Sequence, residues 1–299
     1  MSTDNLVGRT VAGYRLAKYI GEGGTATVYR AEHPERGLAA VKILRTRLAS
    51  DPVAVKRFLR EAEYGSRVIH PNIVKTYDYG AADGVQYLAL EWAQGEPLAE
   101  FVNRSGRLAP PLVATIIEQL GGALSAAHKA GIIHRDLKPA NIMYDPATQT
   151  AKLLDFGIAR DAELSPEERL TRAGFFVGTL QYVAPETLSG ELVSEQADVY
   201  SLATIAYYLL TLEHPFTGKS PRELFQQLLT QSPVPLNQAV KGLRFPAAVE
   251  AAVMGGLERD LNRRHKTVDD FATAFCTAVK DGAGKRPGFL ASLFRKGGE

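Results

Sequence analysis

The sequence is poor in cysteine and has no long apolar run. Its 299 residues include one cysteine, Cys276, so no intrachain disulfide can form and a reducing compartment fits better than secretion. The six histidines lack zinc-site spacing, so any metal should be held by oxygen ligands. No window approaches the roughly 18 apolar residues that cross a bilayer, and the first residues, MSTDNLVGRTVAGYR, lack a basic start followed by an apolar run. We therefore expect a cytoplasmic protein.

Neither sign of charge dominates the sequence. The formal net charge is +2, and 45% of the residues are apolar. A chain of this length and composition can bury one large core or two medium lobes. No segment combines low hydropathy with a long charge run, so extensive disorder is not expected. The composition is typical of a globular enzyme.

The two halves of the chain have different periodicities. Residues 14–90 contain short β-type runs separated by turns, which predict an antiparallel sheet. One helix is expected at 52–68, with Asp51 as N-cap and proline at its first position. Past Gly95 helical periodicity takes over, so the second half should be mainly α. A cleft between two such lobes is the usual place for a ligand site.

Residues 280–299 differ from the rest of the chain. Lys285, Arg286, Arg295 and Lys296 flank the apolar run FLASLF within them. We interpret this segment as a basic, flexible tail. The alternative is a short amphipathic piece that touches a membrane or leads to a membrane span.

A glycine-rich turn lies between two of the expected strands. Gly21, Gly23 and Val28 in GEGGTATVY resemble the phosphate-covering loop of protein kinases, with Ala26 at the place of the third glycine. The chain continues as a strand and not as a helix, which suits a hairpin over phosphates better than a dinucleotide-binding motif. An ordinary hairpin turn is the alternative interpretation.

A lysine and a glutamate form the second signal. Lys42 in AAVKIL occupies the place of the kinase strand lysine, whose ammonium can reach phosphate oxygens. A lysine within an apolar strand needs a partner. Glu61 matches the helix glutamate that pairs with it, whereas Glu63 points elsewhere on the helix. We therefore predict an ion pair between Lys42 and Glu61.

The most specific motif is HRDLKPAN at residues 134–141, which is similar to the kinase catalytic loop at every motif position. Asp136 is expected to orient an acceptor hydroxyl and take its proton, and Lys138 to neutralise charge on the transferred phosphoryl group. Asn141 and Asp155, the latter in DFG at 155–157, match the oxygen ligands of magnesium. These residues predict phosphoryl transfer from a nucleotide.

Three matches lie farther along the chain. The segment GTLQYVAPE, residues 178–186, resembles the part of kinases that receives the substrate residue, and its Thr179 suits a small hydroxyl substrate. Arg264 is its expected partner, although the adjacent Arg263 leaves the register open. Asp198 in ADVYSLA matches the helix aspartate that braces the catalytic-loop backbone.

From these motifs the chain is identified as a member of the eukaryotic-like (Hanks-type) protein kinases, most like bacterial serine/threonine kinases. The resemblance implies an α+β, bilobal fold over residues 10–279. A small antiparallel-sheet N-lobe with one helix (about 10–90), a hinge (91–95) and a larger, mainly helical C-lobe (96–279) are expected. It also implies transfer of the ATP γ-phosphate to serine or threonine of protein substrates, with Mg²⁺ or alternatively Mn²⁺, and no nucleic-acid partner beyond the nucleotide.

The resemblance also assigns an adenine pocket. Adenine would lie between Val28, Ala40 and Met143, with Leu90 at the back of the pocket. The backbone from Glu91 to Ala93 would supply hydrogen bonds.

Regulation is implied in the same way. Arg135 and Arg160 would bind a phosphate on Thr171, which we expect the enzyme to add itself, with Ser165 as the other hydroxyl candidate. Gly65, one turn after Glu61, costs about 1 kcal/mol relative to alanine in a helix. We therefore expect contact between two N-lobes in a homodimer to support this helix.

Two other functions compete with the kinase interpretation. A pseudokinase would signal by docking alone, but such copies have usually lost at least one of the five catalytic and metal-binding residues present here. A small-molecule phosphotransferase would share the fold. Those enzymes lack the peptide-seating segment, which this chain has at 178–186.

Overall fold

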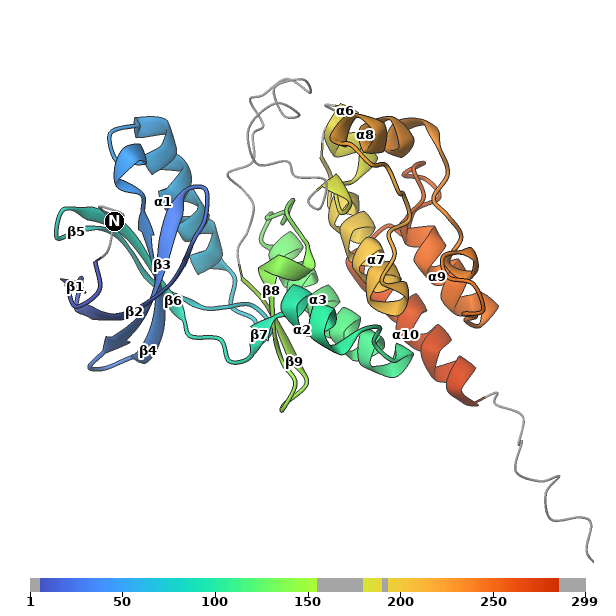
Figure 1. Cartoon of the computed structure of the whole chain (residues 1–299), viewed down its shortest axis with the longest axis horizontal. Helices are drawn as coiled ribbons and strands as arrows, with labels where there is room; N and C mark the ends of the chain where they lie inside the picture. The colour runs from blue at the N-terminus through green and yellow to red at the C-terminus, as the bar shows by residue number, and fades with distance from the viewer. Residues whose placement is uncertain (1–5, 155–179, 190–192, 285–299) are drawn as a thin grey trace, which may run out of the picture.

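A computed structural model describes residues 6–154, 180–189 and 193–284 (Figure 1). A β-sheet with one helix makes up the first lobe, and helices make up most of the second. The predicted bilobal α+β architecture is confirmed. The glycine-rich turn and Glu61 lie in the first lobe, and the HRDLKPAN loop lies in the second.

The N-lobe is a six-stranded antiparallel sheet with the strand order β1-β2-β3-β4-β6-β5. The strands are β1 (Thr10–Val11), β2 (Tyr14–Glu22), β3 (Ala26–His33), β4 (Gly37–Leu44), β5 (Thr76–Ala82) and β6 (Val85–Glu91). Alternating side chains form two buried clusters, as the period of two in a strand requires. One cluster centres on Tyr29 and Val41, and the other packs against the lobe's helix.

Helix α1 (Pro52–Arg67) begins where the sequence predicts. The Asp51 carboxylate accepts a hydrogen bond from the Val53 N–H at 2.9 Å, and proline occupies the first turn. Phe58 and Ala62 are buried against the sheet. The helix packs against β5 and β6, beside the strand β4 that bears Lys42, and this sets the position of Glu61 relative to Lys42.

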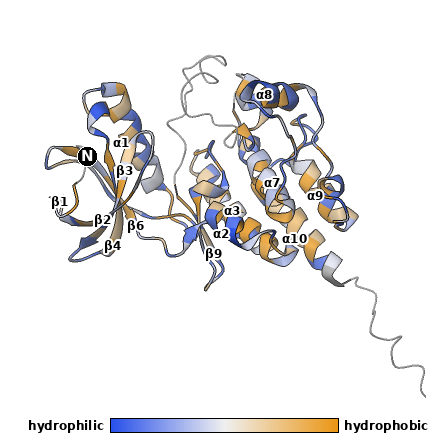
Figure 2. Cartoon of the chain, in the orientation of Figure 1, coloured by the Kyte–Doolittle hydropathy of each residue, from blue (hydrophilic) through white to orange (hydrophobic). Residues whose placement is uncertain are grey.

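The C-lobe is helical. Its helices are α2 (Leu98–Ser105), α3 (Pro110–Lys129), α6 (Pro185–Ser189), α7 (Gln196–Thr211), α8 (Pro221–Thr230), α9 (Ala247–Gly256) and α10 (Val268–Gly284). Almost every residue of α7 is buried, and α3, α9 and α10 pack around it. Hydrophilic residues predominate on α8 (Figure 2). Helix α10 continues to Gly284, five residues past the expected domain end at 279.

A small second sheet was not predicted. It consists of β7 (Glu96–Pro97), β8 (Ile142–Asp145) and β9 (Thr150–Leu153) in that order. A 3-10 turn at Pro139–Asn141 leads directly into β8. This sheet therefore holds both ends of the segment between the HRDLKPAN loop and Asp155.

Two connections join the lobes. At the first, Gly95 has φ 92°, and a Cβ there would lie 2.1 Å from the Tyr144 carbonyl oxygen, so only glycine fits. At the second, the segment after α1 pairs with β9. The Leu153 N–H donates to the Asn72 carbonyl at 2.8 Å, and the Val74 N–H donates to the Leu153 carbonyl at 2.9 Å.

Gln119 of α3 fastens this second connection. Its amide oxygen accepts hydrogen bonds from Asn72 Nδ2 at 3.0 Å and from the Ala151 N–H at 2.7 Å. Asn72 Nδ2 also donates to the Ala151 carbonyl at 2.8 Å. One α3 side chain thus ties the segment after α1 to the strand that precedes Asp155. In 6–154, 180–189 and 193–284, no helix is long and apolar enough to span a bilayer.

Candidate active site

The glycine-rich turn connects β2 and β3, as the sequence predicts for a hairpin. The Gly23 N–H donates to the Ala26 carbonyl at 2.8 Å. Arg45 Nη1 donates to the Gly23 carbonyl at 3.3 Å, and Arg47 Nη2 donates to the Gly24 carbonyl at 3.1 Å. The segment after β4 thus ties down the tip of the turn. Sequence reasoning missed both arginines, whose only signal is their closeness to Lys42.

Lys42 and Glu61 lie together. Lys42 Nζ is 3.8 Å from Glu61 Oε1, and both side chains are mostly buried. Glu63 instead forms an ion pair with Arg67 one turn along the same helix. The structure therefore brings together the pair expected from the sequence and leaves Glu63 on the outer surface.

The strand register puts most of the expected adenine-pocket residues on one sheet face. Gly21 lies opposite Val28, Val28 opposite Lys42, and Ala40 opposite Leu90. Residues opposite one another share a face, as do residues two apart on one strand. Val28, Ala40 and Leu90 thus lie on the same face as Lys42.

The other residues expected in the adenine pocket do not all lie with this group. Ala93 packs against the cluster that contains Leu90, and so does Leu154, which sequence reasoning missed. Met143 lies on β8 opposite Lys152 and is not among the residues packed against this cluster. The Glu91 N–H donates to the Lys75 carbonyl at 2.8 Å and is therefore not available to adenine.

The HRDLKPAN loop concentrates polar groups on one carboxylate. Lys138 Nζ lies 3.1 and 3.3 Å from the two carboxylate oxygens of Asp136. Asn141 Nδ2 donates to the Asp136 carbonyl at 2.8 Å and to its Oδ2 at 3.0 Å. Both amide hydrogens of Asn141 point at Asp136, so the amide oxygen is the atom it offers to a metal. An amide oxygen beside a carboxylate is a donor set that fits Mg²⁺.

Asp198 of α7 braces this loop from within the C-lobe, as predicted. Its buried carboxylate accepts hydrogen bonds from the N–H groups of His134 at 2.8 Å and Arg135 at 3.0 Å. His128 Nε2 lies 2.8 Å from the same carboxylate. Burial alone would raise the pKa of Asp198, but the His128 hydrogen bond, the two histidine charges and the His134 N–H together lower it. Asp198 therefore remains a carboxylate.

This brace holds an unusual backbone conformation. Arg135 has φ 64°, in the left-handed region that residues with a side chain rarely adopt. Two N–H bonds to one buried carboxylate fix the chain immediately before Asp136. His128, which completes the brace, was missed because in the sequence it looks like another residue of a mainly apolar helix.

The segment that is expected to seat the substrate is held by an internal ion pair. Arg264 Nη1 lies 2.6 Å from Glu186 Oε1, and Nη2 lies 3.0 Å from Oε2. Both side chains are buried, and Arg264 also donates to the carbonyls of Gln196 and Glu258. Arg263 is exposed, so the expected pairing through Arg264 is confirmed.

The same segment contacts an aromatic cluster. The Tyr182 hydroxyl lies 3.1 Å from His214 Nε2, and the His214 ring stacks on Tyr208 with centroids 4.8 Å apart. Burial lowers the pKa of His214 from 6.5 to about 4. His214 is therefore neutral near pH 7. Sequence reasoning did not single out His214.

Several expected site residues cannot be placed. Asp155, Arg160, Ser165, Thr171 and Thr179 lie outside the described residues. Within the parts of the chain that the structure covers, no group of three or more histidine, cysteine, aspartate or glutamate side chains could hold a metal ion.

The fold and these motifs define a protein kinase. The family model described as "Protein kinase domain" matches residues 14–277, and the chain belongs to this family. Its similar relatives include bacterial serine/threonine-protein kinases. Pkn3 of Myxococcus xanthus is 38% identical over 90% of this chain and 50% of its own length, and PknE of Mycobacterium tuberculosis is 37% identical over 89% and 46%.

A solved structure agrees with this assignment. The crystal structure of the Mycobacterium tuberculosis PknI kinase domain has a TM-score of 0.70 and 29% sequence identity, and the match covers 91% of this chain and 98% of that one. The chain spans about half the length of the curated relatives it matches. The similarity to them therefore concerns their kinase domains.

Proposed function

We propose that this chain is the catalytic domain of an ATP-dependent protein serine/threonine kinase that acts in the cytoplasm. The observation that carries the proposal is the geometry around Asp136. Its carboxylate is contacted by Lys138 and Asn141, and the two residues before it are fixed through their N–H groups by Asp198. The Lys42–Glu61 pair is also formed. A pseudokinase would not need all of these contacts.

Each residue has a definite role in the proposed reaction. ATP supplies the γ-phosphoryl group, which forms a bond to the acceptor hydroxyl oxygen as its bond to ADP breaks. Asp136 orients the hydroxyl and accepts its proton, while Lys138 offsets charge on the moving group. Lys42 positions phosphate oxygens and is itself positioned by Glu61. Asn141 and Asp155 would hold Mg²⁺, or alternatively Mn²⁺.

Protein substrates fit better than small molecules. The anchored Glu186 and the buried Leu180 and Tyr182 hold a segment that only a peptide-seating enzyme needs. The test is incubation of the chain with labelled ATP and Mg²⁺ and either a peptide library or an aminoglycoside. We expect phosphate on serine and threonine of peptides. Phosphorylation of the aminoglycoside alone would assign the chain to the small-molecule enzymes.

Activation by phosphate on Thr171 is part of the proposal. Arg135 Nε is buried and has no hydrogen-bond partner among the described residues, which supports a binding role for its guanidinium. Arg160 would complete the phosphate site. The Thr171→Ala and Ser165→Ala variants separate the two candidate hydroxyls. We expect only Thr171→Ala to lose activation by preincubation with ATP. Full turnover by that variant would contradict the assignment.

Pairing through N-lobes is the regulatory part of the proposal. Gly65 lies inside α1, and Ile69, just beyond the helix, is 83% exposed. Val53 at the other end of α1 is also exposed, so each end of the helix has one apolar side chain that a second N-lobe would cover. We expect specific activity to rise with protein concentration. Flat specific activity across a wide dilution series, with monomers throughout by light scattering, would contradict pairing.

A further inference from the structure

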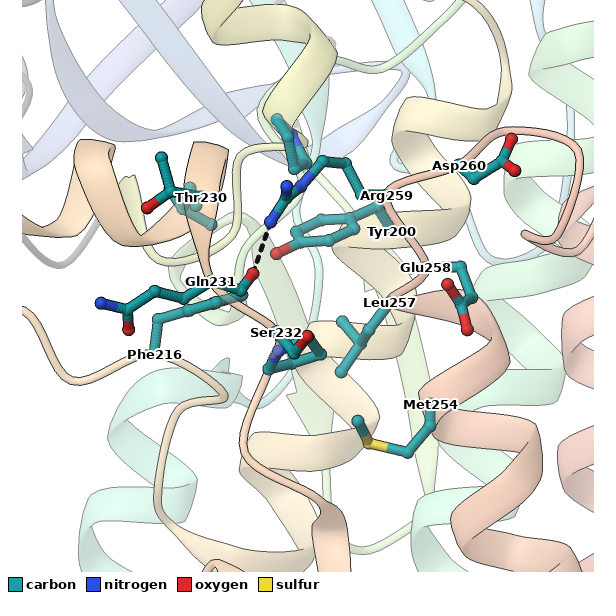
Figure 3. Close-up of a pocket in the computed structure, with 13 residues that line it drawn as sticks. Tyr200, Phe216, Thr230, Gln231, Ser232, Met254, Leu257, Glu258, Arg259 and Asp260 are labelled. Atoms are coloured by element: carbon teal, nitrogen blue, oxygen red, sulfur yellow. Dashed lines mark hydrogen bonds between the residues drawn. The ribbon is translucent and has the colours of Figure 1, made fainter.

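A groove in the C-lobe has no assigned role. It encloses about 570 Å³ between α8, the end of α9 and the loop that follows α9 (Figure 3). Its wall is partly apolar, with Phe216, Leu228, Met254 and Leu257 among the lining residues. Grooves of this size and composition are typical of sites that take an apolar group and a few polar ones.

The hydroxyl of Tyr200 in this groove lacks a partner. The side chain is 1% exposed, and its oxygen has no hydrogen-bond partner within the described ranges. Figure 3 shows the hydroxyl end of the ring directed toward the Gln231 side of the groove. A buried hydroxyl without an acceptor is destabilising, and this oxygen is covered by the groove wall, so an occupant would reach and satisfy it once the Gln231 side of the groove shifts.

The mouth of the groove carries carboxylates. Arg259 donates to the Gln231 carbonyl, the dashed bond in Figure 3, and this joins the loop after α9 to the end of α8. Its guanidinium is therefore held in the wall of the groove. Glu258, before it in the chain, adds negative charge to the lining, and Asp260, after it, adds a carboxylate that is paired with the exposed Arg263. A basic occupant with apolar side chains fits this arrangement.

Residues 285–299 of this chain have that chemistry. They contain the apolar run FLASLF between two basic pairs. The end of α10 lies beside the start of α9, because a Cβ on Gly282 would lie 2.6 Å from Pro246 Cγ. Met254, in the groove, is eight residues along from Pro246, about 12 Å at the helical rise. Phe289 is seven residues past Gly282 and can span about 23 Å.

We propose that residues 285–299 dock in this groove of their own chain. Phe289 and Phe294 cover the apolar wall, and a backbone carbonyl of the segment accepts the Tyr200 hydroxyl. Arg295 and Lys296 face the acidic mouth. The Tyr200 ring lies 5.2 Å from the guanidinium of Arg264, which anchors Glu186. Docking therefore contacts a residue that lies against Arg264, the residue that anchors the substrate-seating segment.

Cross-linking between two introduced cysteines tests the docking in the full chain. Cys276 is buried, and burial raises its pKa to about 11, so the native thiol stays unreactive. Ala291→Cys is combined with Ser232→Cys in the groove or, as a control, with Asn103→Cys on α2. With a short bismaleimide, we expect the Ser232 pair to cross-link within one chain at least about tenfold faster than the control pair. Equal rates would overturn the proposal.

Two further variants show whether the groove chemistry is responsible. Tyr200→Phe removes the orphan hydroxyl and should slow the Ser232 cross-link about fivefold. Tyr14→Phe removes another buried hydroxyl without a partner, in the N-lobe, and should leave the rate unchanged. If the Ser232 cross-link forms at the same rate in Tyr200→Phe as in the unchanged chain, the proposed hydrogen bond to the Tyr200 hydroxyl is wrong. Phe289→Ser with Phe294→Ser should abolish the difference from the Asn103 control.

Other occupants give different results. Cross-links between chains that increase with protein concentration would mean that a second copy supplies the segment, which overturns docking within one chain. Protease protection of residues 285–299 that appears only with vesicles of anionic phospholipid would mean a membrane partner, and would also overturn it. Protection without vesicles, unchanged by dilution, supports the proposal.

Discussion

Arg264 and Glu186 form a two-point ion pair inside the C-lobe, with 2.6 and 3.0 Å between their guanidinium nitrogens and carboxylate oxygens. Removal of one partner leaves the other charge buried, which costs about 3–5 kcal/mol. We expect Glu186→Gln to lower the free energy of unfolding by about that amount in denaturant titrations. The control is Arg263→Ala, which removes an exposed pair with Asp260 and should change stability by less than about 1 kcal/mol.

The ion pair of Lys42 predicts a contrast between two neighbouring glutamates. Glu61→Gln should lower peptide phosphorylation at least about tenfold, because the lysine loses the charge that positions it. Glu63→Gln changes only a surface pair with Arg67 and should keep full activity. Initial rates at saturating ATP measure both. Equal losses in the two variants would contradict the assignment of Glu61.

The catalytic carboxylate can be tested apart from the fold. Asp136→Asn and Lys42→Ala should each lower phosphoryl transfer by about 100-fold or more, since both act on positioning and charge. Thermal unfolding should be nearly unchanged, because neither side chain belongs to the buried clusters. Turnover like that of the unchanged chain in either variant would remove the proposed mechanism.

The brace on the catalytic loop predicts a different pattern. Asp198→Asn leaves one amide oxygen for three donors, so at least one buried N–H loses its partner at a cost of about 1–3 kcal/mol. Relaxation of the backbone at Arg135 should also displace Asp136. We expect lower kcat with little change in the KM for ATP, together with a lower midpoint of thermal unfolding. An unaltered kcat would show that the loop holds its shape without Asp198.

His214 predicts a pH dependence of stability. Its folded pKa is about 4 against an ordinary 6.5, so between these values the unfolded chain binds a proton that the folded chain does not. This contribution is complete above about pH 6.5 and is lost as the pH falls toward 4. When the pH falls from about 7 to about 5, the free energy of unfolding should decrease in both proteins. The decrease should be about 2 kcal/mol smaller in His214→Gln than in the unchanged chain. Parallel pH curves from denaturant titrations would show that His214 does not contribute.

Sequence reasoning succeeded where a local rule determined the outcome. The start of α1 follows from Asp51 and Pro52, whose effects act within one turn. The Arg264–Glu186 pair and the Asp198 brace followed from motifs matched to a known family. These contacts were therefore predicted from the resemblance, because no local rule connects residues so far apart in the chain.

The unpredicted parts depend on contacts between distant segments. Strand β7 has two residues, which is too short for any periodicity to indicate it. Gln119 is an unremarkable helix residue until the fold brings Asn72 and Ala151 to it. The orphan hydroxyl of Tyr200 is likewise visible only once its surroundings are known. Such features arise from tertiary packing, which sequence patterns record poorly.

Gly95 makes the junction between the lobes asymmetric. Its missing side chain lets the connecting strand lie directly against Tyr144, so the C-lobe end of the link is clamped backbone to backbone. We expect any change in the angle between the lobes to occur on the N-lobe side, at residues 92–94, and at the pairing of residues 72–74 with β9, which Gln119 restrains. The link therefore has one fixed end, and the residues at its other end, 92–94, lie outside the motifs that carry the catalytic side chains.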